Sequence, residues 1–176
     1  LQKGLVAGMV SLGNDFSANK VFVPEMLMAA RCMTAATEIL KPLLVKGESK
    51  SAGKVCMGTV KGDMHDIGKN LVKIMMEGSG LTVIDLGTDV SAETFVDTAI
   101  NENCDIICCS ALLTTTMDEM KKVVALAKEK GIRDKVKIMI GGAPITQEYC
   151  DEIGADIYTA DAAAAAKRAV NALANK

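Results

Sequence analysis

Five short apolar runs, each followed by a longer amphipathic stretch, constrain the fold of this chain more than any other feature. The apolar runs lie at residues 54–60, 81–87, 104–110, 136–142 and 155–159. The stretches between and after them have the length and apolar spacing of helices, and lie at 67–79, 91–102, 117–131, 145–153 and 161–174. Strands that alternate with helices form a parallel sheet with helices on both faces. The sequence therefore predicts an α/β fold, with a five-stranded parallel sheet of the flavodoxin/Rossmann-like type and strand order 2-1-3-4-5.

The N-terminal part of the chain has a different pattern, which predicts helices without strands. A short helical stretch at 4–13 precedes a longer one, in which apolar or small residues recur at spacings of four and three. These residues are Phe22, Met26, Ala29, Met33, Ala36, Leu40 and Leu43. Two helices cannot bury a core alone, so we expect this part to pack on the sheet domain. The predicted organisation is a helical-bundle cap over 1–45, a polar linker over 46–53 and the sheet domain over 54–176.

Composition and charge exclude several classes of protein. The net charge of −2 and the pI near 5.5 argue against a nucleic-acid surface, which would have clustered Lys and Arg. No apolar run approaches the roughly 20 residues of a membrane span. No cleavable signal is visible, so we expect a cytoplasmic protein, although a chain that starts at Leu1 is expected to be trimmed at its N-terminus. The six cysteines form no C-x-x-C pair, and we expect reduced, buried thiols.

Three polar or glycine-bearing segments follow three of the predicted strands directly. Residues 62–70, with the sequence GDMHDIGKN, follow the first strand and contain the only histidine, His65. A run of hydroxyl residues at 110–116 follows the third strand, and Gly141-Gly142 follows the fourth. The carboxyl ends of parallel strands meet at one edge of a sheet, where α/β proteins bind ligands. The sequence therefore predicts one binding site at this edge.

The spacing around His65 restricts the chemistry of that site. Asp63 lies two residues before His65, so its carboxylate can reach one ring nitrogen, fix the tautomer and leave the other nitrogen facing outward. A general base and a metal ligand both fit this arrangement, and a hydrogen-bonded turn residue is the plain alternative. A nucleophilic triad is disfavoured, because Ser110 does not lie in a nucleophile-elbow sequence. With a single histidine, any metal bound here must bring most of its ligands with it, as a macrocycle-bound metal does.

These residues resemble the three-part motif of corrinoid-binding domains. The motif is Asp63-x-His65-x-x-Gly68, then Ser110-x-Leu112, then Gly141-Gly142. Such domains are the cobalamin-binding modules of methionine synthase and of the corrinoid proteins in anaerobic methyltransferase systems. The segment VFVPEMLMAARCMTAATEILKPLL is similar to the four-helix cap of the same proteins. The cap here is short of its first helix or so, which we expect to be trimmed or supplied otherwise.

The resemblance implies a cofactor and a role for each motif residue. Cobalamin or a related corrinoid would bind with His65 as the lower axial ligand of cobalt, Asp63 would hold the other ring nitrogen, and Thr116 would complete the relay. The nucleotide tail of the cofactor would lie beside Ser110, Leu112 and Thr114, where Gly68, Gly141 and Gly142 leave room. Further implied contacts are Met64, Asp66, Ile67, Ala143, Tyr158, Ala160 and Asp161, with Phe22 and Met26 of the cap over the upper face of the corrin.

The resemblance also implies a function. The chain would carry a methyl group on cobalt, in a cycle between Co(I) and methyl-Co(III), as a subunit of a multi-component methyltransferase rather than a complete enzyme. Its partners would be a donor-specific methyltransferase, for which we lean to an O-demethylase, an acceptor methyltransferase for tetrahydrofolate or a thiol, and a reductive activator. Methylamines, methanol and betaines stay open as donors. The alternatives are the cobalamin-binding subunit of an adenosylcobalamin mutase, which the helical cap disfavours, and a cobalamin-sensing regulator, for which no output domain is visible.

Overall fold

The predicted parallel sheet and its strand order are both confirmed in the computed structural model, which describes residues 2–44 and 52–174. The strands are hydrogen-bonded in the order β2-β1-β3-β4-β5, and every pair is parallel. They span Lys54–Thr59 (β1), Thr82–Asp85 (β2), Ile106–Ser110 (β3), Lys137–Gly141 (β4) and Ile157–Tyr158 (β5). Since β1 and β3 are neighbours but not consecutive, the chain reverses its direction of winding between them, which is where a doubly wound sheet opens a crevice.

The register brings the carboxyl ends of the central strands level with each other. Thr59 is paired with Ser110, and Ser110 is paired with Gly141. The segments that follow β1, β3 and β4 therefore start at the same edge, as the sequence predicted. All five observed strands are shorter than predicted, β5 having two residues and β2 four. Four of them end earlier than predicted because the chain turns into loops at this edge, and β3 is shortened only at its start. After β2, for example, Gly87 has the left-handed φ of 83°.

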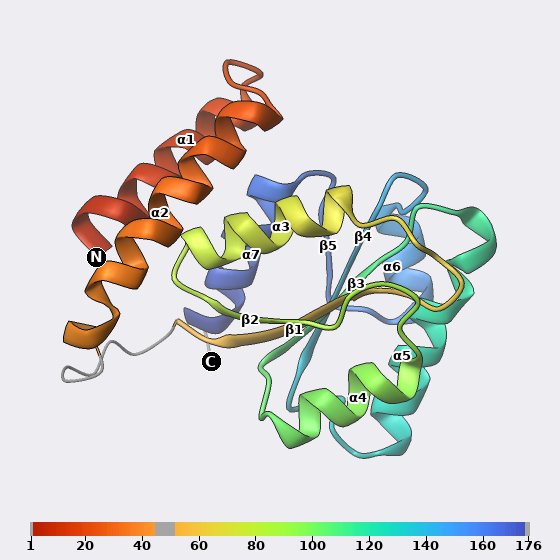
Figure 1. Cartoon of the computed structure of the whole chain (residues 1–176). Helices are drawn as coiled ribbons and strands as arrows, with labels where there is room; N and C mark the ends of the chain where they lie inside the picture. Colours follow the sequence, from red (N-terminus) through yellow and green to blue (C-terminus); the bar gives the residue numbers. More distant parts are fainter. Residues whose placement is uncertain (1, 45–51, 175–176) are drawn as a thin grey trace.

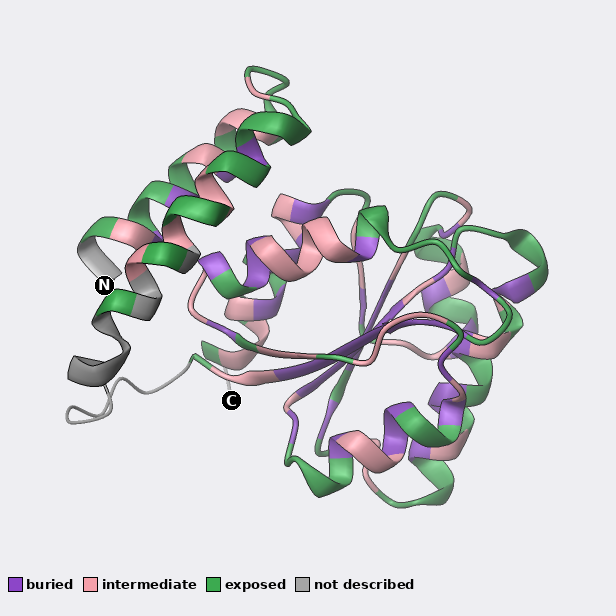
Figure 2. Ribbon diagram, viewed as in Figure 1, coloured by how far each residue is buried: buried purple, intermediate pink, exposed green. Residues whose placement is uncertain are grey.

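Helices cover both faces of the sheet (Figure 1). They span Ile67–Gly78 (α3), Ala92–Asn101 (α4), Asp118–Glu129 (α5), Gln147–Ile153 (α6) and Ala162–Ala174 (α7). Figure 1 shows α4, α5 and α6 on one face, and α3 and α7 on the other. Each face has its own core, and Phe95 on α4 is the largest fully buried side chain among the described residues. Figure 2 shows the buried residues concentrated on the strands and on the helix sides that face them.

The N-terminal part forms a pair of helices that packs beside α3 and α7 (Figure 1). One turn of π-helix at Gln2–Val6 leads into α1, Ala7–Ser17, and α2 spans Val23–Leu44. Met9 and Met26 from this pair lie in one core cluster with Met75 and Met76 of α3. The expectation that the helical part packs on the sheet domain is confirmed. The first helix extends four residues further than predicted, to Ser17.

Three other expectations have different outcomes. Most of the predicted linker falls on 45–51, which lie outside the described residues, so the domain boundaries stay a prediction. The cysteines are free thiols, and all are buried except Cys32, which is exposed on α2, so the expectation of burial is wrong for that residue. Within the described ranges, no helix combines the length and the apolar character that crossing a membrane requires.

Candidate functional site

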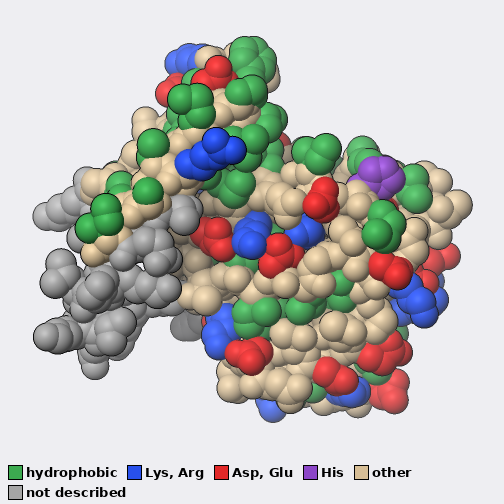
Figure 3. Space-filling model, in the orientation of Figure 1, with side chains coloured by type: hydrophobic (Ala, Val, Ile, Leu, Met, Phe, Trp, Pro, Cys, Tyr) green, Lys and Arg blue, Asp and Glu red, His purple; other side chains and the backbone are tan. Residues whose placement is uncertain are grey.

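In the loop after β1, His65 is held by Asp63, which lies two residues before it. Nδ1 of His65 lies 2.7 Å from Oδ1 of Asp63, and the backbone N–H of His65 donates to the same oxygen at 3.0 Å. The Asp63 side chain is fully buried, whereas 52% of the His65 side chain is exposed. Figure 3 shows the imidazole on the molecular surface with hydrophobic side chains beside it. The ring is therefore held from one side and open on the other, as the spacing predicted.

The second oxygen of Asp63 is held by the segment after β3. The backbone N–H groups of Leu112 and Leu113 donate to Oδ2 at 2.7 and 3.2 Å, and the hydroxyl of Thr116 lies 3.1 Å from it. Burial raises the pKa of Asp63, but these hydrogen bonds and those from His65 outweigh burial, so the pKa lies well below its usual range. An ionised carboxylate only accepts hydrogen bonds. In a neutral imidazole, the proton is therefore on Nδ1, and the lone pair of Nε2 faces outward.

Thr116 is placed by a single turn of 3-10 helix, Thr114–Thr116, and is buried. Its hydroxyl lies 2.9 Å from the carbonyl oxygen of Leu113 as well as 3.1 Å from Asp63. A hydroxyl group has one proton to donate. It can therefore serve either acceptor, and the Asp63 bond can be made or released without moving the side chain.

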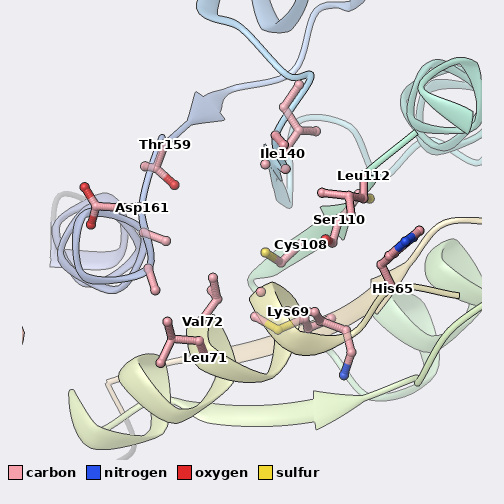
Figure 4. A pocket seen from close by; sticks show the side chains of 18 of the residues that line it. His65, Lys69, Leu71, Val72, Cys108, Ser110, Leu112, Ile140, Thr159 and Asp161 are labelled. Atoms are coloured by element: carbon pink, nitrogen blue, oxygen red, sulfur yellow. The ribbon is translucent and has the colours of Figure 1, made fainter. Parts of the chain in front are cut away.

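A cavity of about 780 Å³ opens beside His65 (Figure 4). It lies between α3 and α7, at the carboxyl ends of β3, β4 and β5, and its walls are mainly apolar. Figure 4 shows Leu71 and Val72 on the α3 side, and Thr159 and Asp161 at the far end from His65. Thirteen of the predicted contact residues line it: Met64, His65, Asp66, Ile67, Gly68, Ser110, Leu112, Gly141, Gly142, Ala143, Tyr158, Ala160 and Asp161.

The glycines at this edge differ in the physical reason for their presence. Gly142 has a φ of 134°, and a Cβ there would collide with the carbonyl group of Ala111. Gly141 has ordinary backbone angles, and its Cβ would meet only the carbonyl oxygen of Thr159, at 3.5 Å. Gly68 would place a Cβ in open space, with nothing within 4 Å. The fold itself thus requires Gly142, whereas Gly68 leaves the cavity mouth free.

Three of the predicted contacts are not brought to this cavity. Thr114 is exposed on the 3-10 turn and does not line it. Phe22 is 63% exposed and borders a smaller cavity of about 440 Å³, together with Phe16 and Asp161. Met26 has no exposed surface and lies in the core shared with α3, so it does not face the cavity in this structure, and its contact with the cofactor stays a prediction.

Several cavity residues were missed from the sequence. Cys108 and Met139 lie two residues before Ser110 and Gly141, and side chains alternate between the two faces of a strand. The period of two could therefore have identified both. Phe16 on α1 also lines the cavity. No pattern in the sequence indicates this, because only the packing of the helical pair on the sheet domain brings α1 to the site.

The residues at this site fit a metal that arrives with its own ligands. Among the described residues, no group of three or more His, Cys, Asp or Glu side chains could hold a metal ion. The site offers one nitrogen donor, Nε2 of His65, beside a long apolar cavity. A corrin ring supplies four equatorial nitrogens, so it needs from the protein one axial donor and room for its tail. Both requirements are met here.

Comparisons with known proteins give the same result. A family model described as a B12 binding domain matches residues 53–170, and a second with that description matches residues 1–41. The dimethylamine corrinoid protein of Methanosarcina barkeri is 47% identical over 175 residues, which are 99% of this chain and 82% of that protein.

Two solved structures are similar along almost the whole chain. One is the methanol:cobalamin methyltransferase complex of Methanosarcina barkeri, with a TM-score of 0.88 and 31% identity, covering 99% of this chain and 67% of that chain. The other is a cobalamin-binding protein from Desulfitobacterium hafniense DCB-2, with a TM-score of 0.82 and 36% identity, covering 96% and 80%. The chain belongs to the family of corrinoid proteins with B12-binding domains.

Proposed function

We propose that this protein carries a methyl group on the cobalt of a bound corrinoid, as a component of a corrinoid-dependent methyltransferase. The observation that carries the proposal is the pair of Asp63 and His65, with Nε2 of the imidazole left open beside a cavity of about 780 Å³. The relationship to a dimethylamine corrinoid protein at 47% identity supports it. A bound corrinoid supplies a cobalt centre that accepts and gives up the methyl group.

His65 would hold the cobalt of the cofactor through Nε2. The Asp63 carboxylate, 2.7 Å from Nδ1, keeps the proton on that nitrogen and leaves the lone pair of Nε2 free for the metal. The carboxylate stays ionised, because the hydrogen bonds that it accepts hold the pKa of Asp63 well below its usual range. Thr116 adjusts this pair, since its proton can be shared with the carbonyl of Leu113 instead.

The cavity would hold the nucleotide tail of the corrinoid. Its walls are apolar over most of their area, and Ser110, Thr159 and Asp161 place polar atoms along its length. The α3 wall near His65 is open because Gly68 has no side chain. Phe16 extends the wall from the helical pair, so this pair would cover part of the cofactor.

Corrinoid proteins of this family work with methyltransferase partners, as the methanol:cobalamin methyltransferase complex illustrates. For this chain we infer a donor methyltransferase that acts on a methylamine, because its relative is a dimethylamine corrinoid protein. The prediction from the sequence that the donor methyltransferase is an O-demethylase has no support from the relatives reported above, and it stays a prediction. The acceptor methyltransferase, the reductive activator and a cytoplasmic location are proposals too. The mutase and regulator alternatives are not favoured, because a dimethylamine corrinoid protein and a methanol:cobalamin methyltransferase complex are among the relatives of this chain.

The test of corrinoid binding is a UV–visible spectrum. The protein is reconstituted anaerobically with hydroxocobalamin and desalted, in parallel with the His65→Ala variant. We expect both to retain colour, and the band that reports imidazole ligation to be absent only from the variant. Because His65 is the only histidine, no other imidazole of the chain can produce that band. Colourless wild-type protein, or an unchanged spectrum in the variant, would overturn the proposal.

The test of the methyl donor uses the reconstituted, reduced protein. It is mixed with a methylamine methyltransferase and dimethylamine, trimethylamine or monomethylamine, and in parallel with an O-demethylase and a methoxylated aromatic. We expect the spectrum of the methylated corrinoid with one methylamine and not with the aromatic ether. Methylation by the aromatic ether alone would favour the O-demethylase prediction instead.

A further inference from the structure

The His65 loop is held from a second side by the loop after β2, residues 86–91. The backbone N–H of Asp89 donates to the carbonyl oxygen of Asp63 at 3.0 Å. The Asp89 carboxylate accepts a hydrogen bond from the backbone N–H of Gly62 at 2.7 Å. Asp89 thus binds two consecutive residues of the loop, Gly62 and Asp63, which precede Met64 and His65.

The 86–91 loop is itself anchored to β1. The pairing with β1 continues past the end of β2, because the N–H of Thr59 donates to the carbonyl of Gly87 and the N–H of Val90 donates to the carbonyl of Thr59, each at 2.9 Å. A parallel bridge between Val60 and Val90 extends it further. Asp89 therefore lies between two anchored positions, Gly87 and Val90.

The backbone of Asp89 is in an uncommon conformation. Its φ is 56°, in the left-handed region, which side chains other than glycine, asparagine and aspartate rarely adopt. Holding such a residue costs conformational energy, and strained positions of this kind cluster at functional sites. Here the conformation is what lets the N–H and the carboxylate of one residue reach adjacent peptides of the His65 loop.

We propose that Asp89 is a positioning residue for His65, which acts by fixing the peptide of Asp63 so that the Asp63 carboxylate is aimed at Nδ1. Asp89 does not line the cavity, and its hydrogen bonds go to the main chain of Gly62 and Asp63 rather than to the imidazole. Its effect passes through the main chain of Asp63 instead. The proposal rests on the proposed role of His65 as the axial ligand.

The variants follow from the left-handed backbone. Asp89→Gly keeps the conformation and removes the acceptor, whereas Asp89→Asn keeps both the conformation and the Oδ1 acceptor. Asn103 has a φ of 52° and is exposed before β3, at the other edge of the sheet, so Asn103→Gly is the matched control for added backbone freedom. Circular dichroism and the melting temperature establish that each variant is folded.

Two readouts are used, one of which needs no cofactor. In the apo-protein, ¹⁵N NMR of the imidazole reports the tautomer of the only histidine at neutral pH. In protein reconstituted with hydroxocobalamin, the UV–visible spectrum reports the ratio of histidine-bound to histidine-free corrinoid. We expect Asp89→Gly to lower two ratios about fivefold: that of the Nδ1–H to the Nε2–H tautomer, and that of histidine-bound to histidine-free corrinoid. A change of about fivefold corresponds to the loss of one hydrogen bond at an exposed site. Asp89→Asn and Asn103→Gly should stay close to wild type.

The outcomes separate this proposal from the proposed function. If Asp89→Gly leaves both readouts at the wild-type value, or if Asp89→Asn behaves like Asp89→Gly, the positioning role is overturned. A lower melting temperature with an unchanged tautomer would overturn it too, because that is what a purely structural residue gives. If the wild type binds no corrinoid, the proposed function fails, and the tautomer measurement alone then decides on Asp89.

Discussion

At the scale of single residues, Gly141 and Gly142 are adjacent, yet the structure makes opposite demands on them. A Cβ at Gly142 would collide with the backbone of Ala111, and the φ of 134° is strained for any other residue. A Cβ at Gly141 would make one ordinary contact. We expect Gly142→Ala to lower the free energy of unfolding by about 3 kcal/mol or more, and Gly141→Ala to change it by less than about 1 kcal/mol.

Urea denaturation of the apo-proteins measures both values. Because the two glycines lie side by side at the same edge of the sheet, each is the control for the other. Similar losses in the two variants would show that the close approach of Gly142 to Ala111 is not what makes this glycine necessary.

At the scale of elements, α3 has its second residue, Gly68, at the mouth of the cavity. In a helix, glycine is less favourable than alanine by roughly 0.5–1 kcal/mol. A Cβ at Gly68 would meet nothing within 4 Å in the apo-protein. We therefore expect Gly68→Ala to raise the melting temperature slightly and to reduce the amount of corrinoid retained after desalting, since the methyl group would occupy space at the cavity mouth.

The matched control for Gly68→Ala is Gly8→Ala. Gly8 is also the second residue of its helix, α1, is exposed, and would place its Cβ in open space. It should gain similar stability and retain corrinoid like the wild type. Undiminished retention by Gly68→Ala would mean that the cofactor does not pass this point.

The join between β2 and α3 is an ion-pair cluster that makes stability depend on pH. Asp85, at the end of β2, accepts from Lys69 at 2.6 Å and from Lys73 at 3.2 Å, and Lys69 is almost fully buried. Burial raises the pKa of Asp85, but the hydrogen bonds from Lys69, from the Gly87 N–H and from Lys73 outweigh burial, and the pKa falls to about 2. A carboxyl group whose pKa is lowered by folding stabilises the protein at pH values above its unfolded pKa. This contribution is lost as the pH falls through the folded pKa.

We expect the wild type to lose about 2 kcal/mol of stability through Asp85 between about pH 4 and pH 2, and Asp85→Asn to lack this loss. At pH 7 the variant should be less stable than the wild type by a similar amount, because it leaves the buried Lys69 with a weaker partner. Urea denaturation across this pH range measures the difference. Asp97→Asn, which removes an exposed partner of Lys130, is the control and should have little effect. Parallel pH profiles for wild type and Asp85→Asn would contradict the assignment.

At the scale of the whole molecule, the helical pair and the sheet domain share one core. Met26 is fully buried in the cluster that contains Met75 and Met76, whereas Met28, two residues further along α2, is 67% exposed. We expect Met26→Ala to lower the free energy of unfolding by about 2–4 kcal/mol and Met28→Ala by less than about 0.5 kcal/mol. Since the core is shared, thermal unfolding of the apo-protein should be a single transition. Two separate transitions would mean that the helical pair folds independently.

Much of the site could be predicted because its central contact is local. Asp63 and His65 are two residues apart, so the turn after β1 alone brings the carboxylate to the imidazole. The convergence of the segments after β1, β3 and β4 also follows from the sequence, since parallel strands with short connections end at the same edge. Resemblance to a family added Thr116, whose bond to Asp63 spans 53 residues and which no local pattern indicates.

Periodicity and spacing by themselves determined the parallel sheet, its strand order and the pair of Asp63 and His65, because these depend on which residues are apolar and on contacts within a few residues. The tertiary structure alone decided that Met26 lies in the core shared with α3, that Phe16 reaches the cavity, and that Asp89 holds the peptide of Asp63. Each of these depends on how two elements distant in the sequence are packed. A pattern within one element fixes which side of it is buried, and does not fix which partner covers that side.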